Sequence, residues 1–172
     1  QEPPAIQIGS LGNLVFEGNN SNYSFSVANP AQLASVAENG TVHDVTNLPD
    51  CVYGDKLLFM RATANTTFIY SQVINDAYMS STNNAPYEDE DLSRQMAIVA
   101  RMIKGGLGTK VYMVTLNGFD THANQLEQQR RLLEDLSDSI KNFYTDLEAG
   151  GMSEKVLTMT ISEFGRRPYE NG

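Results

Sequence analysis

The sequence predicts an α/β protein in which helices cover a mostly parallel sheet. Residues 110–116 (KVYMVTL) and 155–162 (KVLTMTIS) are both apolar and rich in strand-forming residue types. A long amphipathic pattern at 124–149 lies between them. A strand, a crossover helix and a second strand form a right-handed βαβ unit, so we expect the two strands to be parallel.

The N-terminal part has a different pattern, which predicts short strands joined by tight turns. The segments AIQIG, NLVFEG and YSFSVAN are separated by SLGN and GNNSN. These connections carry the Gly and Asn residues that tight turns favour. We therefore expect a small region rich in β-hairpins at residues 5–28.

Helical signals follow. Asn29 and Pro30 are suited to the cap and first position of a short helix at 30–38. Residues 55–80 are also predicted to be helical. After a polar loop, a further helix is indicated by four apolar residues at helical spacing and by the Gly pair at 105–106 that ends it. The four residues are Leu92, Met96, Val99 and Ile103.

These patterns divide one domain into two portions. Residues 1–54 form a β-rich, turn-rich N-terminal portion, and residues 55–172 hold the helices and the βαβ core. The sequence ends in RRPYENG, which has the character of a loop, and we expect the chain to be a fragment of a longer one. Its first residues have neither the basic nor the apolar region of a signal peptide.

Composition excludes some partners. The chain has 12 basic and 21 acidic residues and a formal net charge of −9. Nucleic acids and anionic membrane surfaces attract clusters of Lys and Arg, so neither is an expected partner. No run of about 18 apolar residues is present, which argues against a membrane span. The single Cys51 permits no intramolecular disulfide and is predicted to be a buried thiol.

The candidate site lies where the two predicted strands of the βαβ unit end. In open α/β sheets, ligands bind beyond the carboxyl ends of the strands. The first strand leads to Asp120 and His122, and the second leads to Glu163 and Arg166. If the strands are neighbours, these four side chains meet at one rim.

Each candidate has two interpretations. Asp120 and His122 are able to bind a divalent cation, or else Asp120 or Thr121 caps the following helix and His122 is polar surface. Glu163 is a ligand or an acid/base and Arg166 holds an anionic oxygen, or the two form a structural ion pair. His43 is either a third ligand or a polar loop residue.

The second half of the chain resembles a known bacterial family. The strings RQMAIVARMIKGGLGTKVYMVTLNGFDTHANQ and VLTMTISEFGRRPYENG are similar to the Domain of Unknown Function 1501 proteins. That family has a helix, a GLGT turn, a strand, a GGFDTH motif, a helix and a strand ending in SEFGR. The resemblance covers about residues 90–172.

The resemblance implies a fold and a class of activity. The fold would be a three-layer, alkaline-phosphatase-like or sulfatase-like sandwich, in which divalent metals help to hydrolyse phosphate or sulfate esters. Asp120 and His122 would then lie at a metal-binding rim with Glu163 and Arg166 close by. Family members commonly carry a twin-arginine signal, which implies a periplasmic or cell-surface location.

The sequence departs from the family pattern at a few points. Asn117 stands where Gly is usual, and Arg167-Pro168 replaces the residues usual after SEFGR. The family's later Thr-Asp-His-Gly segment is absent from these residues, so this chain alone is expected to be inactive. The alternative function is non-catalytic, with the fold retained by an exported protein that binds a carbohydrate or a partner protein.

Overall fold

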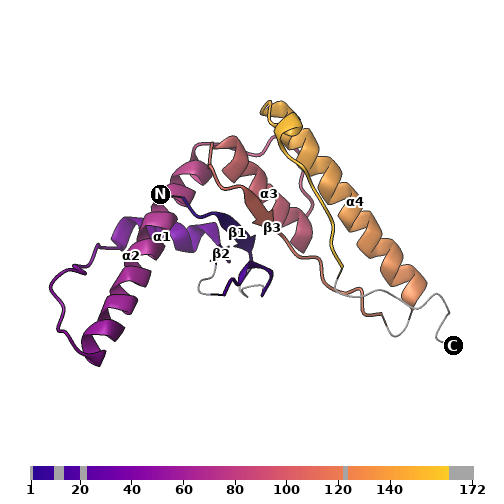
Figure 1. The fold of residues 1–172 in the computed structure, drawn as a ribbon. Coiled ribbons are helices and arrows are strands. Elements are labelled where there is room, and N and C mark those ends of the chain that lie inside the picture. The colour runs from indigo at the N-terminus through magenta and orange to yellow at the C-terminus, as the bar shows by residue number, and fades with distance from the viewer. Residues whose placement is uncertain (1, 10–13, 20–22, 122–123, 163–172) are drawn as a thin grey trace.

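The computed structural model describes residues 2–9, 14–19, 23–121 and 124–162 (Figure 1). Along the chain the elements are β1 (Ala5–Ile8), η1 (Leu14–Phe16), β2 (Ser24–Val27), α1 (Pro30–Asn39), α2 (Val52–Met79), α3 (Asp91–Lys104), β3 (Val111–Met113), α4 (Gln125–Ala149) and η2 (Ser153–Lys155). Short parallel strands combined with long helices confirm the predicted α/β class.

The sheet has three strands in the order β2-β1-β3, and both pairings are parallel. Ala5 lies opposite Ser24 on one side and Val111 on the other. All four residues of β1 are buried, as expected for the central strand of a sheet that is covered on both faces. The sheet therefore joins the two N-terminal strands to β3, which follows α1, α2 and α3 along the chain.

The two N-terminal strands that the structure describes, β1 and β2, do not form a predicted β-hairpin. A hairpin requires antiparallel strands, whereas β1 and β2 are parallel. Of the NLVFEG segment, Leu14–Phe16 form the 3-10 turn η1 in place of a strand. Parallel pairing is possible because the connection between Ile8 and Ser24 is long enough to return to the end of the sheet where β1 begins. The burial of all of β1 is typical of a strand in a parallel sheet.

The helices agree closely with the expected ranges. The side chain of Asn29 accepts a hydrogen bond from the amide of Ala31 at 2.8 Å and Pro30 begins α1, as predicted. In α3, Leu92, Met96 and Val99 are buried on one stripe. Local capping and periodicity therefore determine where these helices lie.

α2 and α3 pack very closely where α3 ends. A Cβ on Gly105 would lie 1.9 Å from the carbonyl oxygen of Ala77 in α2, so only glycine fits there. The next residue, Gly106, has a φ of +84°, a conformation that other residues rarely adopt. The Gly pair predicted to end the helix thus also permits its contact with α2.

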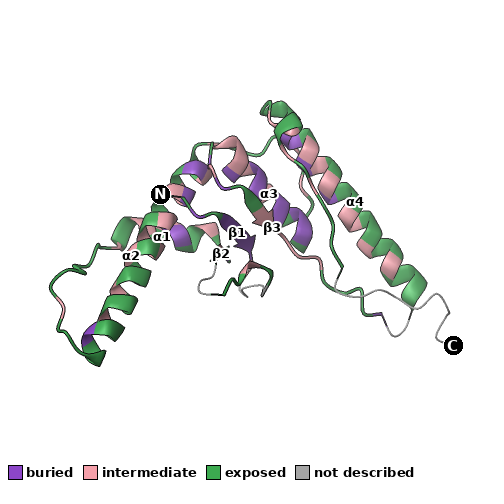
Figure 2. Ribbon diagram, viewed as in Figure 1, coloured by how far each residue is buried: buried purple, intermediate pink, exposed green. Residues whose placement is uncertain are grey.

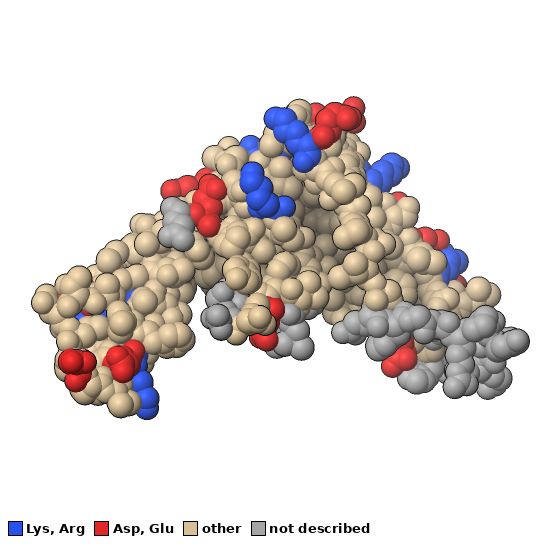
Figure 3. Space-filling model, viewed as in Figure 1, with Lys and Arg blue, Asp and Glu red and all other residues tan. Residues whose placement is uncertain are grey.

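α2 extends beyond the body of the molecule. Its C-terminal half buries Ser71, Ile74 and Ala77, while its N-terminal half projects away from the sheet (Figures 1 and 2). Several large apolar side chains on this projecting half are exposed, namely Val52, Tyr53, Leu58, Phe59 and Met60. On the face drawn in Figure 3 its surface is largely uncharged except at the tip.

The second strand of the predicted βαβ unit is not formed. Residues 156–162 are described but pair with no strand, and they run back alongside α4 (Figure 1). The hydroxyl of Tyr144 in α4 donates to the carbonyl of Val156 at 3.2 Å and accepts from the amide of Thr158 at 3.1 Å. The strand prediction fails because an apolar alternating segment still needs a neighbouring strand, and this one contacts a helix instead.

The core lies between the sheet and the helices. Its buried members include Ile6 and Val27 from the strands, Ile74 from α2, Met102 from α3 and Leu147 from α4. Among the described residues, no helix is long and apolar enough to cross a membrane.

Candidate functional site

The candidate site begins where the chain leaves β3. Thr115 lies just beyond the strand, and its backbone is held by the buried side chain of Gln95 in α3. The amide of Thr115 donates to Oε1 of Gln95 at 3.0 Å, and Nε2 of Gln95 donates to the Thr115 carbonyl at 3.0 Å. Gln95 thus satisfies both backbone groups of one residue, as a neighbouring strand does, and fixes the path of the chain towards residue 120.

Asp120 is exposed at the end of this path. Two residues earlier Gly118 has a φ of +104°, and a Cβ there would lie 3.5 Å from a methyl group of Leu132 in α4. The turn is therefore packed against α4. Thr121 follows with 7% exposure, its amide donating to the carbonyl of Phe119 at 3.0 Å. Asp120 is therefore an exposed residue between a turn packed against α4 and the buried Thr121.

Neither Asp120 nor Thr121 is the N-cap residue of α4, so the capping part of that alternative interpretation is wrong, while His122 lies outside the described residues. The cap residue is Asn124, which has a left-handed backbone with a φ of +49° and forms no side-chain cap hydrogen bond. In the part of the chain that the structure describes, Oγ1 of Thr121 is buried without a hydrogen-bond partner. The polar residues in this loop are consequently not explained by helix capping.

The other predicted site residues lie outside the described residues. These are His122, Glu163 and Arg166. Of the predicted rim, the structure therefore describes the loop that carries Asp120 and the chain as far as Ser162. Within the described ranges, no three His, Cys, Asp or Glu side chains are grouped so as to hold a metal ion.

Two further residues considered from the sequence are placed elsewhere. His43 is exposed, and its amide donates a hydrogen bond to the side chain of Asn65 in α2 at 2.8 Å. The segment 40–51 that contains it lies beside the N-terminal half of α2, far from α4 (Figure 1). Cys51 is exposed at the residue before α2, so the prediction of a buried thiol is wrong. Loop 40–51 packs on the projecting half of α2, which leaves the cysteine uncovered.

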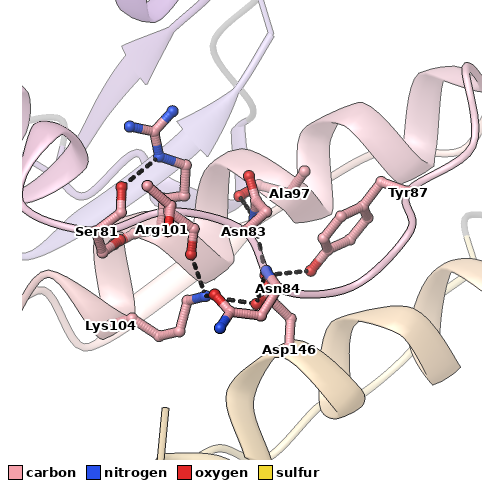
Figure 4. A network of polar contacts seen from close by, with 9 residues as sticks. Ser81, Asn83, Asn84, Tyr87, Ala97, Arg101, Lys104 and Asp146 are labelled. Atoms are coloured by element: carbon pink, nitrogen blue, oxygen red, sulfur yellow. Dashed lines mark hydrogen bonds and ion pairs between the residues drawn. The ribbon is translucent and has the colours of Figure 1, made fainter. Parts of the chain in front are cut away.

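A polar cluster around one buried carboxylate was not predicted (Figure 4). Asp146 in α4 is fully buried and forms an ion pair with Nζ of Lys104 in α3. It also accepts hydrogen bonds from Nδ2 of Asn83 at 2.8 Å, the amide of Asn84 at 2.7 Å and the hydroxyl of Tyr87 at 3.1 Å. One carboxylate therefore joins α3, α4 and the loop between α2 and α3.

The cluster shifts the pKa values of two of its members. Burial alone would raise the pKa of Asp146, but hydrogen bonds from Lys104, Asn83 and Asn84 outweigh it and hold the pKa below its ordinary value. Burial and the neighbouring Asp146 charge raise the pKa of the Tyr87 hydroxyl. At neutral pH the carboxylate is thus charged and the phenol is neutral.

A sequence signal for this cluster exists. Asp146 lies between Phe143 and Leu147, both buried on the inner face of α4. A carboxylate on the apolar stripe of an amphipathic helix is buried and needs donors. The sequence alone does not say which donors, because Asn83, Tyr87 and Lys104 lie 42 to 63 positions away along the chain.

Together these features define a parallel α/β protein with a polar loop beyond the carboxyl end of an edge strand. The family described as "Protein of unknown function (DUF1501)" matches residues 34–172, and the chain belongs to that family. The match begins well before residue 90, so it extends into α1 and α2. No curated protein and no solved structure matches the chain.

Proposed function

We propose that the longer protein to which this chain corresponds is an exported, metal-dependent hydrolase of phosphate or sulfate esters with an alkaline-phosphatase-like sandwich. The observation that carries the proposal is the exposed carboxylate of Asp120, on a loop that follows the carboxyl end of a parallel strand. Ligands of α/β proteins bind at this end of the sheet. The resemblance of the GFDTH and SEFGR motifs to the family pattern supports the same assignment.

In this proposal Asp120 and His122 are metal ligands. Carboxylate oxygen and imidazole nitrogen are both ordinary donors to divalent cations. When bound, the cation supplies a Lewis acid that polarises the ester and lowers the pKa of water. Gln95 fixes the loop through Thr115, and the contact of Leu132 with the turn at Gly118 fixes it from the other side.

Glu163 and Arg166 have the remaining roles. Arg166 pairs with the anionic ester oxygens through its planar guanidinium group. Glu163 accepts the proton of the attacking water, or donates a proton to the leaving alcohol. The net reaction is addition of water across the ester bond, which gives an alcohol and phosphate or sulfate.

Metal analysis of the full-length protein tests the assignment. We expect bound divalent metal in the wild type, loss of most of it in Asp120→Ala and His122→Ala, and unchanged content in the matched control Asp50→Ala. Hydrolysis of para-nitrophenyl phosphate and para-nitrophenyl sulfate should fall by at least 100-fold in the first two variants, about the loss seen when one essential electrostatic group is removed.

Other results would count against the proposal. If the wild type holds no metal and hydrolyses neither ester, the protein is a binding protein with a hydrolase-like fold. If Asp120→Ala and His122→Ala retain the wild-type metal content, these residues are not ligands. Glu163→Gln and Arg166→Lys should retain metal and lose activity, which separates their role from that of the ligands.

A further inference from the structure

A second polar site lies in a groove between α4 and the segment that enters α3. The groove has a volume of about 370 Å³. Five carboxylate residues line it, two from the segment before α3 and three from α4. They are Glu88, Glu90, Glu134, Asp135 and Asp138.

Little in the protein neutralises this charge. The one basic residue that lines the groove, Arg131, forms an ion pair with Glu127 outside it at 2.9 Å. Glu134 is paired with Arg130 at 2.5 Å. Within the described part of the chain, Glu88 and Asp138 have neither an ion pair nor a hydrogen bond through their side chains, and they belong to opposite walls of the groove. The groove therefore concentrates negative potential between two walls.

A buried hydroxyl gives a second and independent indication of a ligand. Ser93 of α3 also lines the groove and is only 1% exposed. Its Oγ has no hydrogen-bond partner among the described residues. Leaving a buried hydroxyl unpaired costs about 1–3 kcal/mol, a cost that a donor bound in the groove would remove.

The spacing of the acids decides which cation fits. No three of these carboxylates converge closely enough to hold a metal ion, as is true throughout the described ranges. On α4, Glu134 and Asp138 are one helical turn apart, about 6 Å. Charges spread along two walls match a chain of separated ammonium groups better than one compact ion.

We propose that this groove is a binding site for a linear polyamine. One ammonium group lies between Glu88 and Asp138 and another pairs with Asp135. An N–H of the bound chain donates to Oγ of Ser93, while the methylene groups between the nitrogens cover the side chain of Leu132, which also lines the groove. Binding in this groove does not require the metal proposed at Asp120.

Titration calorimetry with spermidine at low ionic strength tests the proposal on the full chain. We expect saturable binding by the wild type and at least ten-fold weaker binding by the Glu88→Gln/Asp138→Asn double variant. The matched control Glu38→Gln, which removes an exposed acid on α1, should bind as the wild type does. Mg²⁺ at equal charge concentration should displace spermidine poorly.

Ser93→Ala distinguishes specific binding in the groove from general attraction of a polycation to acidic side chains. This change leaves the net charge unaltered and removes a hydroxyl whose burial without a partner is unfavourable, so the variant should be at least as stable as the wild type in thermal unfolding. We expect spermidine binding to weaken three-fold or more. The proposal is overturned if the double variant binds like the wild type, if Glu38→Gln weakens binding equally, if Ser93→Ala has no effect, or if Mg²⁺ displaces spermidine as effectively as a second polyamine.

Discussion

At the scale of single residues, Asp146 is notable because its carboxylate is charged although the protein removes it from solvent. It is fully buried, and its oxygens accept hydrogen bonds from Asn83, Asn84 and Tyr87 as well as the ion pair from Lys104. A buried carboxylate is tolerated only when such donors replace water. The same donors hold together three segments that are distant in sequence.

Replacing Asp146 by Asn should destabilise the protein by about 3–5 kcal/mol at pH 7, because the charge of Lys104 is then buried without its partner. The pKa of Asp146 is lower in the folded protein than its ordinary value of 3.8. The contribution of Asp146 to the free energy of unfolding is therefore fully present above pH 3.8 and is lost as the pH falls through the folded-state pKa. Urea unfolding from pH 7 to pH 3 measures both effects. The variant should lose less stability on acidification than the wild type.

The matched control is Glu148→Gln, which alters an exposed acid two residues further along α4. It should leave the free energy of unfolding nearly unchanged at pH 7. Equal losses in both variants would show that the buried network contributes nothing beyond ordinary surface charge.

At the scale of elements, a helix side chain takes the place of a neighbouring strand beyond the end of β3. β3 has only three residues, yet the chain continues beyond it in a fixed path because Gln95 bonds to both backbone groups of Thr115. α3 thereby positions the loop that ends at Asp120. The candidate site thus depends on a helix residue that is not itself at the site.

Gln95→Ala should leave two backbone groups of Thr115 unpaired and cost about 1–3 kcal/mol. Hydrogen exchange of the Thr115 amide, followed by NMR, should speed up by at least ten-fold. Gln125→Ala, an exposed residue at the start of α4, serves as the control and should leave that exchange rate unchanged. Unaltered protection of Thr115 in Gln95→Ala would mean that another contact fixes the loop.

At the scale of the whole molecule, the small sheet leaves apolar surface uncovered. β3 is an edge strand, and Val111 on it is 48% exposed. In the segment after α4, Leu157, Met159 and Ile161 are 91%, 79% and 66% exposed. Open strand edges and contiguous apolar surface both favour association between chains.

Replacing Leu157 and Ile161 together by Lys should therefore reduce self-association of this chain. Sedimentation velocity over a range of concentrations should show larger species for the wild type and a single small species for the double variant. Leu126→Lys changes an apolar residue that is 86% exposed on α4 and should have little effect. A wild-type chain that stays monomeric throughout the range would contradict this expectation.

The sequence by itself determined the helices. The Asn29 cap, the stripe from Leu92 to Val99 and the Gly pair at 105–106 all act within a few residues, because helical hydrogen bonds join positions close in the chain. It also located β3 and the exposed loop that carries Asp120.

Only the tertiary structure decided the strand partners and the buried polar contacts. Residues 156–162 have a strand-like pattern, yet Tyr144 holds their backbone beside α4. β1 and β2 pair in parallel despite turn-rich connections, and Asp146 finds Lys104 from a different helix. Such pairings join residues far apart along the chain, so local patterns show that a partner is needed without showing which segment supplies it.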